Sequence, residues 1–452
     1  MCMKNLKRMI LTAAGISLLL CGCGNTVAPA DNRESVTEES TGGSTMASEA
    51  ESTLPDGTEA SSEKNTEHPT VSQEMTSSET ADDESQQETT VVPDEPEDEI
   101  HSSVETLMEE MTLREKVCQM FIVTPEQLTG YGCVTYGDSV VQQSFMDMPV
   151  GGVILFAQNL SYQEQTSQLI SACQDYAMDS CGAGLFVAVD EEGGTVARAA
   201  QKLGTTAFSD MAYYGQMNDT QQAYNIGSTI GSDLSALGFN VDFAPVADVN
   251  LNAGNELGNR IFSSDPEIVS DMTANVVMGL QDQGVCATLK HFPGLGAADG
   301  NTHYDNFVHI YRTLDELREA EFVAFSGGIE AGADFVMVGH QKVSGVGDDL
   351  PADLSYTVVT TLLREELGFQ GIAVTDAQQM NTIAGVYGSG DAAVRSVEAG
   401  IDIILMPADL RAAVDALCYA VEEGRLTKER IDESVVRILN QKAELGLLDI
   451  YE

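Results

Sequence analysis

The sequence predicts an α/β protein whose main body is a (β/α)8 barrel of the TIM type, preceded by a lipoprotein signal peptide and a disordered acidic linker. Short, continuous apolar runs recur from about residue 103 onward, helix-period segments separate them, and polar residues close five of the runs. Continuous apolar runs are typical of strands that are buried on both faces. They therefore favour a parallel sheet covered by helices.

The first segment, residues 1–22, has the layout of an export signal. A start with three basic residues precedes an apolar stretch that is too short to span a bilayer comfortably, and small residues follow. The sequence LCGC at positions 20–23 resembles a bacterial lipobox, so we expect cleavage before Cys23 and lipidation of Cys23. An ordinary signal peptide with incidental cysteines is the alternative.

Residues 23–102 are rich in Ser, Thr and Glu and poor in aliphatic residues. Such a segment cannot bury enough apolar surface to offset the entropy lost on ordering, so we predict a disordered, self-repelling spacer. The chain carries a formal net charge of −49, which argues against nucleic acid as a partner. The expected location is the extracellular face of the cell membrane, with the lipid anchor as the only membrane contact.

Residues 103–452 are expected to form the barrel domain. Its candidate strands are the runs MFIVT (120–124), GGVILF (151–156), LFVAVD (185–190), VDFAPVAD (241–248), CATLKHF (286–292), DFVMVGH (334–340), GIAVTD (371–376) and IDIILMP (401–407). Helical patterns lie between them, for example DELREAEFVAFSGGIEAG after residue 314. Eight such units indicate a (β/α)8 barrel, and an open doubly wound sheet is the alternative.

Six cysteines follow the signal region, and they show neither a CxxC pair nor a spacing to histidine that suggests zinc. They are Cys118, Cys133, Cys173, Cys181, Cys286 and Cys418. We interpret them as buried free thiols, with a disulfide between Cys173 and Cys181 as the alternative.

Polar residues close the runs in a way that points to one site. They are Asp190, Asp248, His291, His340 and Asp376. The carboxyl ends of barrel strands converge on one face, which is where such folds place their chemistry. Asp376 is then a rigid, partly desolvated carboxylate that suits a nucleophile or a ligand, although a helix N-cap explains it equally well.

The stretch DEEGGTVAR carries Asp190 and Arg198, which are expected to accept from and donate to sugar hydroxyls. A surface ion pair is the alternative. In KHFPGLGAADGNTHYDN, Lys290 and His291 end a run as hydrogen-bond donors, and His303 lies on a loop where it can transfer protons. The alternatives for His303 are a simple surface histidine or a metal site with His291 and Asp305.

With Asp376 and His303 included, the region from about residue 104 to 447 resembles the catalytic domain of glycoside hydrolase family 3, in its β-N-acetylhexosaminidase branch. The matching motifs are DEEGGTVAR (190–198), FAPVADVN (243–250), GNRIF (258–262), KHFPG (290–294), NTH (301–303), MVGH (337–340), LPADLS (350–355) and VTDA (374–377). Family members that act on glucosides usually have Trp after the nucleophile, whereas this chain has Ala377.

The resemblance implies a retaining exo-β-N-acetylglucosaminidase that needs no metal or organic cofactor. Asp376 matches the nucleophile and His303 the acid/base of this branch. The positions that match sugar-binding residues are Asp190, Arg198, Arg260, Lys290 and His291. The small residues between Gly294 and Gly300 are expected to give the loop freedom to move His303.

Two positions depart from the family pattern. Leu295 replaces a common His, and Asn301 replaces the Asp that orients the catalytic imidazole and raises its basicity. We expect slower proton transfer and a more acidic pH optimum, unless Asp299 substitutes. The partner is expected to be an N-acetylglucosamine-containing saccharide of the cell wall or another glycan, and the protein a monomer. A saccharide-binding lipoprotein without turnover, or a glycosidase for another β-glycoside, is the alternative.

Overall fold

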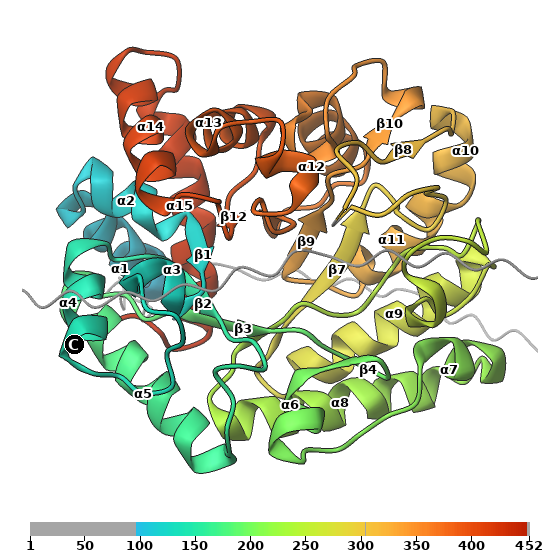
Figure 1. Cartoon of the computed structure of the whole chain (residues 1–452), viewed down its shortest axis with the longest axis horizontal. Helices are drawn as coiled ribbons and strands as arrows, with labels where there is room; N and C mark the ends of the chain where they lie inside the picture. Colours follow the sequence, from blue (N-terminus) through green and yellow to red (C-terminus); the bar gives the residue numbers. More distant parts are fainter. Residues whose placement is uncertain (1–95, 303, 450–452) are drawn as a thin grey trace, which may run out of the picture. The chain divides into compact units, whose positions relative to one another are not determined.

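The computed structural model describes residues 96–302 and 304–449, so the signal peptide 1–22, Cys23, most of the linker and His303 lie outside the described residues. A parallel sheet occupies its centre, with the strand order β11-β9-β7-β6-β3-β2-β1-β12 (Figure 1). The strands are β1 (Phe121–Val123), β2 (Gly152–Ile154), β3 (Phe186–Val189), β6 (Val241–Asp242), β7 (Cys286–Phe292), β9 (Phe335–Val338), β11 (Ile372–Thr375) and β12 (Ile404–Leu405). Each of the eight expected runs supplies one strand.

Strands β11 and β12 meet, which closes the sheet into a barrel. Val374 forms a parallel bridge with Ile403. The Thr375 N–H donates to the Ile403 carbonyl at 3.0 Å, and the Thr375 hydroxyl accepts from the Leu405 N–H at 3.0 Å. The two outer strands of an open sheet stay unpaired, so this contact confirms the predicted barrel and excludes the doubly wound sheet.

Helices follow the strands and cover the outside of the barrel (Figure 1). They are α2 (Leu113–Gln119), α3 (Pro125–Thr129), α4 (Ser139–Asp147), α5 (Gln163–Cys181), α6 (Arg198–Leu203), α7 (Met211–Met217), α8 (Thr220–Leu237), α9 (Pro266–Gln281), α10 (Leu314–Glu319), α11 (Glu321–Glu330), the π-helix η4 (Thr357–Glu366), α12 (Asn381–Ala384), α13 (Ser389–Ala399), α14 (Leu410–Glu422) and α15 (Lys428–Glu444). Short elements complete the rim: the strand pairs β4 (Glu191–Gly193) with β5 (Val196–Ala197) and β8 (His309–Ile310) with β10 (Lys342–Val343), and the 3-10 turns η1 (Gly258–Arg260), η2 (Ser344–Val346) and η3 (Ala352–Leu354).

Helix α8 illustrates how local sequence sets these elements. The Asp219 side chain caps the helix by accepting from the Gln222 N–H at 3.1 Å, and Gly238 ends it in a left-handed conformation. Its buried residues recur at helical spacing: Ala223, Ile226, Gly227, Ile230, Gly231, Leu234 and Leu237. Gly227 and Gly231 lie against the neighbouring helix α9, so this stripe packs α8 closely on α9.

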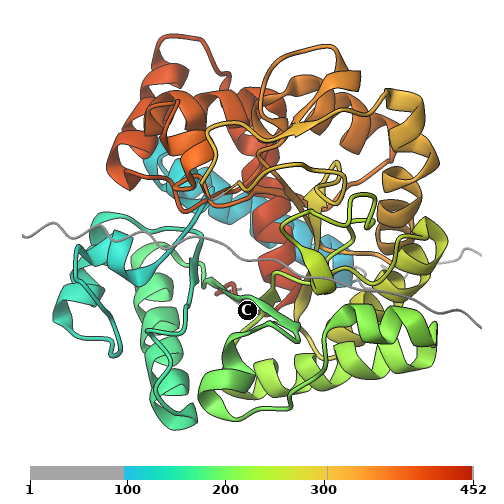
Figure 2. The same cartoon turned by 45° about the vertical axis from the view of Figure 1, so that its right-hand side comes forward.

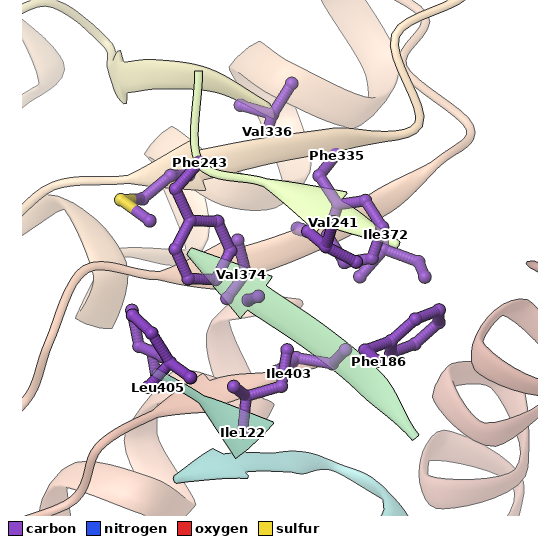
Figure 3. Packing of buried hydrophobic residues seen from close by; sticks show 14 of the residues in the cluster. Ile122, Phe186, Val241, Phe243, Phe335, Val336, Ile372, Val374, Ile403 and Leu405 are labelled. Atoms are coloured by element: carbon purple, nitrogen blue, oxygen red, sulfur yellow. The ribbon is translucent and has the colours of Figure 1, made fainter. Parts of the chain in front are cut away.

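Buried apolar side chains pack on both faces of the sheet, because successive strand residues such as Phe335 and Val336 point to opposite faces (Figure 3). The labelled residues are Ile122, Phe186, Val241, Phe243, Phe335, Val336, Ile372, Val374, Ile403 and Leu405, and each is at most 2% exposed. The rings of Phe186 and Phe335 make an edge-to-face contact at 5.3 Å, which joins two strands that are not neighbours in the sheet. The core is therefore packed, and chemistry is confined to the rim.

Strand β6 is shorter than the sequence predicted. It ends at Asp242, whereas the apolar run continues to Asp248. Regular pairing thus stops three positions before Pro245, which has no N–H to donate to a neighbouring strand. Irregular hydrogen bonds to β7 continue, including the Ala247 N–H to the Lys290 carbonyl at 2.8 Å, and they carry Asp248 to the rim.

The first and last described helices pack together. Helix α1 (Pro96–Glu110) begins seven positions before residue 103, where the sequence placed the start of the domain, and it contacts α15. Figure 2 shows these blue and red segments beside each other, as Figure 1 does. Among the described residues no helix is long and apolar enough to cross a bilayer.

The six cysteines of the barrel domain are all free, so the alternative disulfide between Cys173 and Cys181 does not form. Three of them, Cys118, Cys173 and Cys286, are buried as expected. Cys133 is exposed, because it lies in the irregular segment after α3 and not in an apolar helix or strand.

Candidate active site

A pocket of about 310 Å³ lies at the carboxyl ends of the barrel strands. Six residues that the sequence singled out line it together: Asp190, Arg198, Arg260, Lys290, His291 and Asp376. Its volume lies at the lower end of the range of about 300–1,000 Å³ for small-molecule sites, so it suits one sugar ring better than several. An open hollow of about 600 Å³ beside α7 is larger, but it lacks this group of converging charges.

Asp376 follows β11 directly and is held by the barrel backbone. Its N–H donates to the Val338 carbonyl at 2.9 Å, and its Oδ1 accepts from the Ala377 N–H at 2.7 Å. The next helix, α12, begins only at Asn381, with Met380 at its N-cap position. The alternative that Asp376 is a helix cap is therefore wrong.

The surroundings of Asp376 keep it ionised. Burial alone would raise its pKa, but the charges of His340 and His291 and the Ala377 N–H outweigh burial and hold the pKa of Asp376 below its usual value. A carboxylate that is ionised and partly accessible from the pocket has the charge state that a nucleophile needs.

His340 lies beneath Asp376 and is fully buried. Its Nδ1 is 3.1 Å from Asp353 Oδ1, and its Nε2 is 3.2 Å from the Ala377 carbonyl. Burial opposes the charge, but the carboxylate of Asp353, followed by that of Asp376, raises the pKa of His340 to about 9. The imidazole is therefore a cation at neutral pH. The sequence placed His340 at the rim but gave it no role in the site.

The pocket residue Lys290 forms salt bridges with two carboxylates. Its Nζ lies 2.5 Å from Glu192 Oε1 and 3.0 Å from Asp190 Oδ1. Arg260 donates to Glu192 through Nε and Nη2, both at 2.7 Å. Burial would raise the pKa of Glu192, but Lys290 and Arg260 outweigh it and lower the pKa to about 2.

Glu192 is the main residue that the sequence interpretation missed. It is one of two adjacent glutamates in DEEGGTVAR, and strands β4 and β5 turn its side chain toward Lys290 and Arg260. In a polar stretch of sequence, a glutamate that becomes buried cannot be distinguished from one that stays exposed. Only the presence of two adjacent glutamates indicated a role for Glu192. No salt bridge joins Asp190 to Arg198, so the alternative of an ion pair between them is not supported among the described residues.

His291 is positioned by Asp248 from the end of the β6 segment. Asp248 Oδ2 lies 2.7 Å from His291 Nδ1 and accepts from the His291 N–H at 3.0 Å, while its Oδ1 accepts from the Leu295 N–H at 2.5 Å. Because Nδ1 contacts Asp248, the other ring nitrogen of His291, Nε2, is the one that remains to contact a ligand in the pocket. No group of three or more potential metal ligands gathers in residues 96–302 and 304–449.

The loop after β7 is packed at its start, which corrects the expected freedom of its glycines. A side chain at Gly296 would meet the Val249 carbonyl oxygen at 1.9 Å, and one at Gly294 would meet Glu321 Cγ at 2.4 Å. Both glycines therefore permit close approach and not motion. Leu295 and Ala298 are buried beside them.

The end of the same loop is tied down on both sides. Glu256 Oε1 accepts from the N–H and the hydroxyl of Thr302, at 3.0 and 2.9 Å. The Thr382 hydroxyl donates to the Thr302 carbonyl at 2.7 Å and also contacts the Asp305 carbonyl at 3.1 Å. Thr302, which lines the pocket, is thus held from two sides. Glu256, which also lines the pocket, gave no signal in the sequence beyond its place just before GNRIF.

Comparison with known proteins gives the family. The model of the glycosyl hydrolase family 3 N-terminal domain matches residues 112–441, which is most of the chain. The chain belongs to glycosyl hydrolase family 3. This result confirms the family resemblance seen in the sequence.

Relatives of this family 3 chain include enzymes named for hexosamine substrates. It is 35% identical over 324 residues to Beta-hexosaminidase A of Pseudoalteromonas piscicida, which covers 66% of this chain and 54% of that protein. It is 35% identical over 307 residues to the Beta-hexosaminidase of Stenotrophomonas maltophilia strain R551-3, and the match covers 66% of this chain and 84% of that protein. The chain thus spans about half the length of the first relative and most of the second.

Solved structures agree. A family 3 β-N-acetylglucosaminidase from Paenibacillus sp. strain FPU-7 superposes with a TM-score of 0.70 at 37% identity, covering 75% of this chain and 63% of that one. A β-N-acetylhexosaminidase from Beutenbergia cavernae superposes with a TM-score of 0.64 at 30% identity, and the match covers 74% of this chain and 99% of that one.

Among the family positions, Asn301 lies on the tied loop, directly before the pocket residue Thr302. Its N–H donates to Asp305 Oδ2 at 2.8 Å. Asp299, the residue expected to substitute for the missing family Asp, is exposed and lies two positions before Asn301. His303, the expected acid/base, is outside the described residues.

Proposed function

We propose that this family 3 protein is a retaining exo-β-N-acetylglucosaminidase that removes terminal β-linked N-acetylglucosamine from cell-wall fragments or other glycans. The observation that carries the proposal is the ionised Asp376 carboxylate in a pocket sized for one sugar, surrounded by fixed donors and acceptors. The hexosaminidase names of the relatives support the choice of sugar.

The proposed reaction has two steps. In the first, an Asp376 oxygen attacks the anomeric carbon while His303 gives its proton to the glycosidic oxygen, so the leaving saccharide departs with a hydroxyl group. A covalent glycosyl-enzyme remains. In the second, His303 takes a proton from water, the water oxygen attacks the same carbon, and Asp376 is released as a carboxylate.

The remaining residues are proposed to hold the sugar. Lys290 and His291 present donors on the pocket floor, and Asp190 presents a carboxylate acceptor beside them. Arg198 and Arg260 also line the pocket. Arg260 already donates to Glu192 through Nε and Nη2, so only the remaining N–H groups of its guanidinium are proposed to bind the sugar. Asn301 is proposed to orient His303 without stabilising its cation.

The proposed setting is the outer face of a bacterial membrane. Cys23 would carry lipid after removal of residues 1–22, and residues 23–95 would act as a tether, since residues 96–102 belong to helix α1. A flexible coil of that length has an r.m.s. span of about 45 to 50 Å. We further propose that the protein acts as a monomer.

The test is to trap the glycosyl-enzyme with a fluorinated N-acetylglucosamine analogue and to locate the modified residue by mass spectrometry. We expect label on Asp376, and label on another side chain would overturn the mechanism. A wild-type protein that binds saccharides without turning over any chromogenic N-acetylglucosaminide would instead be a binding lipoprotein, which Asn301 suggests as the second candidate. A panel of other β-glycosides tests the remaining choice of sugar.

A further inference from the structure

A buried imidazole lies behind the carboxylate that is proposed to attack the sugar. His340 comes two positions after β9, is fully buried and does not line the pocket, so it cannot touch a bound sugar. Its ring contacts Asp353 of η3 on one side and the carbonyl of Ala377, the residue after Asp376, on the other. Any part that His340 takes in the reaction must therefore act through Asp376.

The contacts of the His340 ring require a proton on both nitrogens. Nε2 lies 3.2 Å from the Ala377 carbonyl, which can only accept a hydrogen bond. Nδ1 lies 3.1 Å from Asp353 Oδ1, and neither of these two atoms has another partner among the described residues. A lone pair on Nδ1 would face the lone pairs of the carboxylate. The stable arrangement is therefore an imidazolium beside an ionised carboxylate.

Asp353 is held in place and in its charged form. Its Oδ2 accepts from Gln378 Nε2 at 3.2 Å, and the same amide nitrogen also donates to the Ser396 hydroxyl at 2.8 Å. The Asp353 N–H donates to the Gly339 carbonyl at 3.1 Å. A donor beside one oxygen and a cation beside the other both favour the ionised carboxylate. Asp353 is thus a permanent counterion for His340 inside the protein.

Three cations face Asp376, and His340 has the largest effect on it. Burial raises the pKa of Asp376, and the charge of His340 is the largest influence that lowers it, followed among the charges by His291 and Lys290. The charges that face His340 in turn are those of Asp353 and Asp376. His291 and Lys290 line the pocket and are proposed to bind the sugar, whereas His340 does not line it. The charge of His340 therefore bears on the carboxylate alone.

We propose that His340, paired with Asp353, is a positioning residue for the second step of the reaction, in which the bond between Asp376 and the anomeric carbon breaks. This inference rests on the proposed function, because it takes Asp376 as the nucleophile. In that step water gives a proton to the general base, its oxygen bonds to the anomeric carbon, and the electron pair of the broken bond returns to Asp376. A cation that is already fixed beside the developing negative charge stabilises the transition state.

The same cation opposes the first step. Asp376 loses its negative charge when it forms the glycosyl ester, so its attraction to His340 is lost as the new bond forms. Without a second carboxylate, the imidazolium would then be a buried charge with no partner, which is strongly unfavourable. Asp353 prevents this, because it stays ionised beside Nδ1 in both steps. The pair therefore slows the first step somewhat and accelerates the second.

A ring-fluorinated N-acetylglucosaminyl fluoride measures the two steps separately on the full chain. The rate of inactivation reports the formation of the glycosyl-enzyme, and the recovery of activity after removal of excess reagent reports its hydrolysis. The variant is Asp353→Asn, measured at pH 8. At this pH the pKa of about 9 keeps His340 charged in the wild type, whereas an imidazole with the ordinary pKa of about 6.5 is neutral.

We expect Asp353→Asn to lower the rate constant of recovery about tenfold and to leave that of inactivation unchanged or higher, because a neighbouring cation shifts a carboxyl pKa by about one to three units. The acidic limb of kcat/KM, which reports the ionisation of Asp376, should move to higher pH by about one unit. Ser396→Ala is the matched control, since it removes a hydrogen bond from the same buried network without changing a charge. It should change neither the ratio of the two rate constants nor the acidic limb.

Should Asp353→Asn fold poorly, the double change His340→Gln with Asp353→Asn replaces both buried charges by amides and is expected to give the same pattern. An equal loss of both rate constants would overturn the inference, because a merely structural pair slows the two steps alike. An unchanged ratio with an unmoved acidic limb would overturn it as well. In either case label on Asp376 would leave the proposed function standing, whereas wild-type label on another residue, or none, would refute both.

Discussion

The Nζ of Lys290 lies 2.5 Å from Glu192 Oε1, and both side chains are only 2% exposed. Such a pair is expensive to desolvate and strongly destabilising to break, because the remaining charge stays buried without its partner. Arg260 shares the same carboxylate, so Glu192 fixes two of the cations of the pocket. Glu192 is thus a positioning residue for the groups proposed to bind the sugar.

We predict that Glu192→Gln lowers the free energy of unfolding by about 3 kcal/mol and kcat/KM by about 100-fold, because Lys290 keeps a buried charge and loses its geometry. Denaturant unfolding and steady-state kinetics measure the two effects. The control is Glu398→Gln, which breaks the exposed pair with Arg425 and should cost under about 1 kcal/mol. Equal effects of the two changes would contradict the assignment.

The pair of His340 and Asp353 predicts a pH dependence of stability. Because the pKa of His340 is raised to about 9 from its ordinary 6.5, its charge contributes stability that is complete below about pH 6.5 and is lost as the pH rises through 9. Asp353→Asn removes the strongest influence that raises this pKa. The decrease in the free energy of unfolding caused by Asp353→Asn should therefore be large at pH 6 and smaller at pH 9.5.

Denaturant unfolding at those two pH values tests this. Asp391→Asn breaks the exposed pair with Arg395 and is the control, with a small and constant effect. If the loss in Asp353→Asn were the same at both pH values, His340 would not be the cation inferred here.

Asn301 should limit proton transfer. We predict that Asn301→Asp raises kcat/KM about tenfold and moves the alkaline limb of its pH profile to higher pH, because a carboxylate stabilises the protonated form of His303 that the first step requires. Asn306→Asp adds the same charge to an exposed residue of the same loop and should do neither. An unmoved alkaline limb in Asn301→Asp would show that position 301 does not act on the histidine.

The hydroxyl of Thr382 holds the loop that carries His303. We predict that Thr382→Val lowers kcat about tenfold with little change in KM, because the carbonyls of Thr302 and Asp305 lose a donor and the proton donor is less well placed. Thr360→Val removes a comparable hydroxyl bond to the Ala399 carbonyl far from the pocket, and its kcat should match wild type. Loss of kcat in both variants would point to general destabilisation.

Much of the fold could be predicted because all eight strands are buried on both faces and appear as continuous apolar runs. Strand ends were harder: the run that contains Pro245 continues to Asp248, yet regular pairing stops at Asp242. The apolar character of the run and its proline are visible in the sequence, whereas the residue at which regular pairing ends is not. The closure of β11 on β12 needed coordinates, since it joins residues such as Val374 and Ile403 through only a short contact.

The site was predictable where chemistry and strand ends coincide, as for Asp376, Lys290 and His291. The site was not predictable where one polar residue positions another side chain or loop. Glu192 and Glu256 act through the groups they bind, and a single sequence does not reveal those contacts. The glycines at 294 and 296 were misread for a related reason, because a glycine that permits motion and one that permits close packing are identical in sequence.

The bridge between Ala183 and Leu448 places the last described residues at the amino-terminal end of β3, opposite the pocket mouth. A tag or immobilising group attached after Leu448 would therefore be directed away from the substrate entrance. The protein fixed to a chip by that end would present its pocket to the flowing solution, which makes this the preferred attachment point for saccharide-binding sensors.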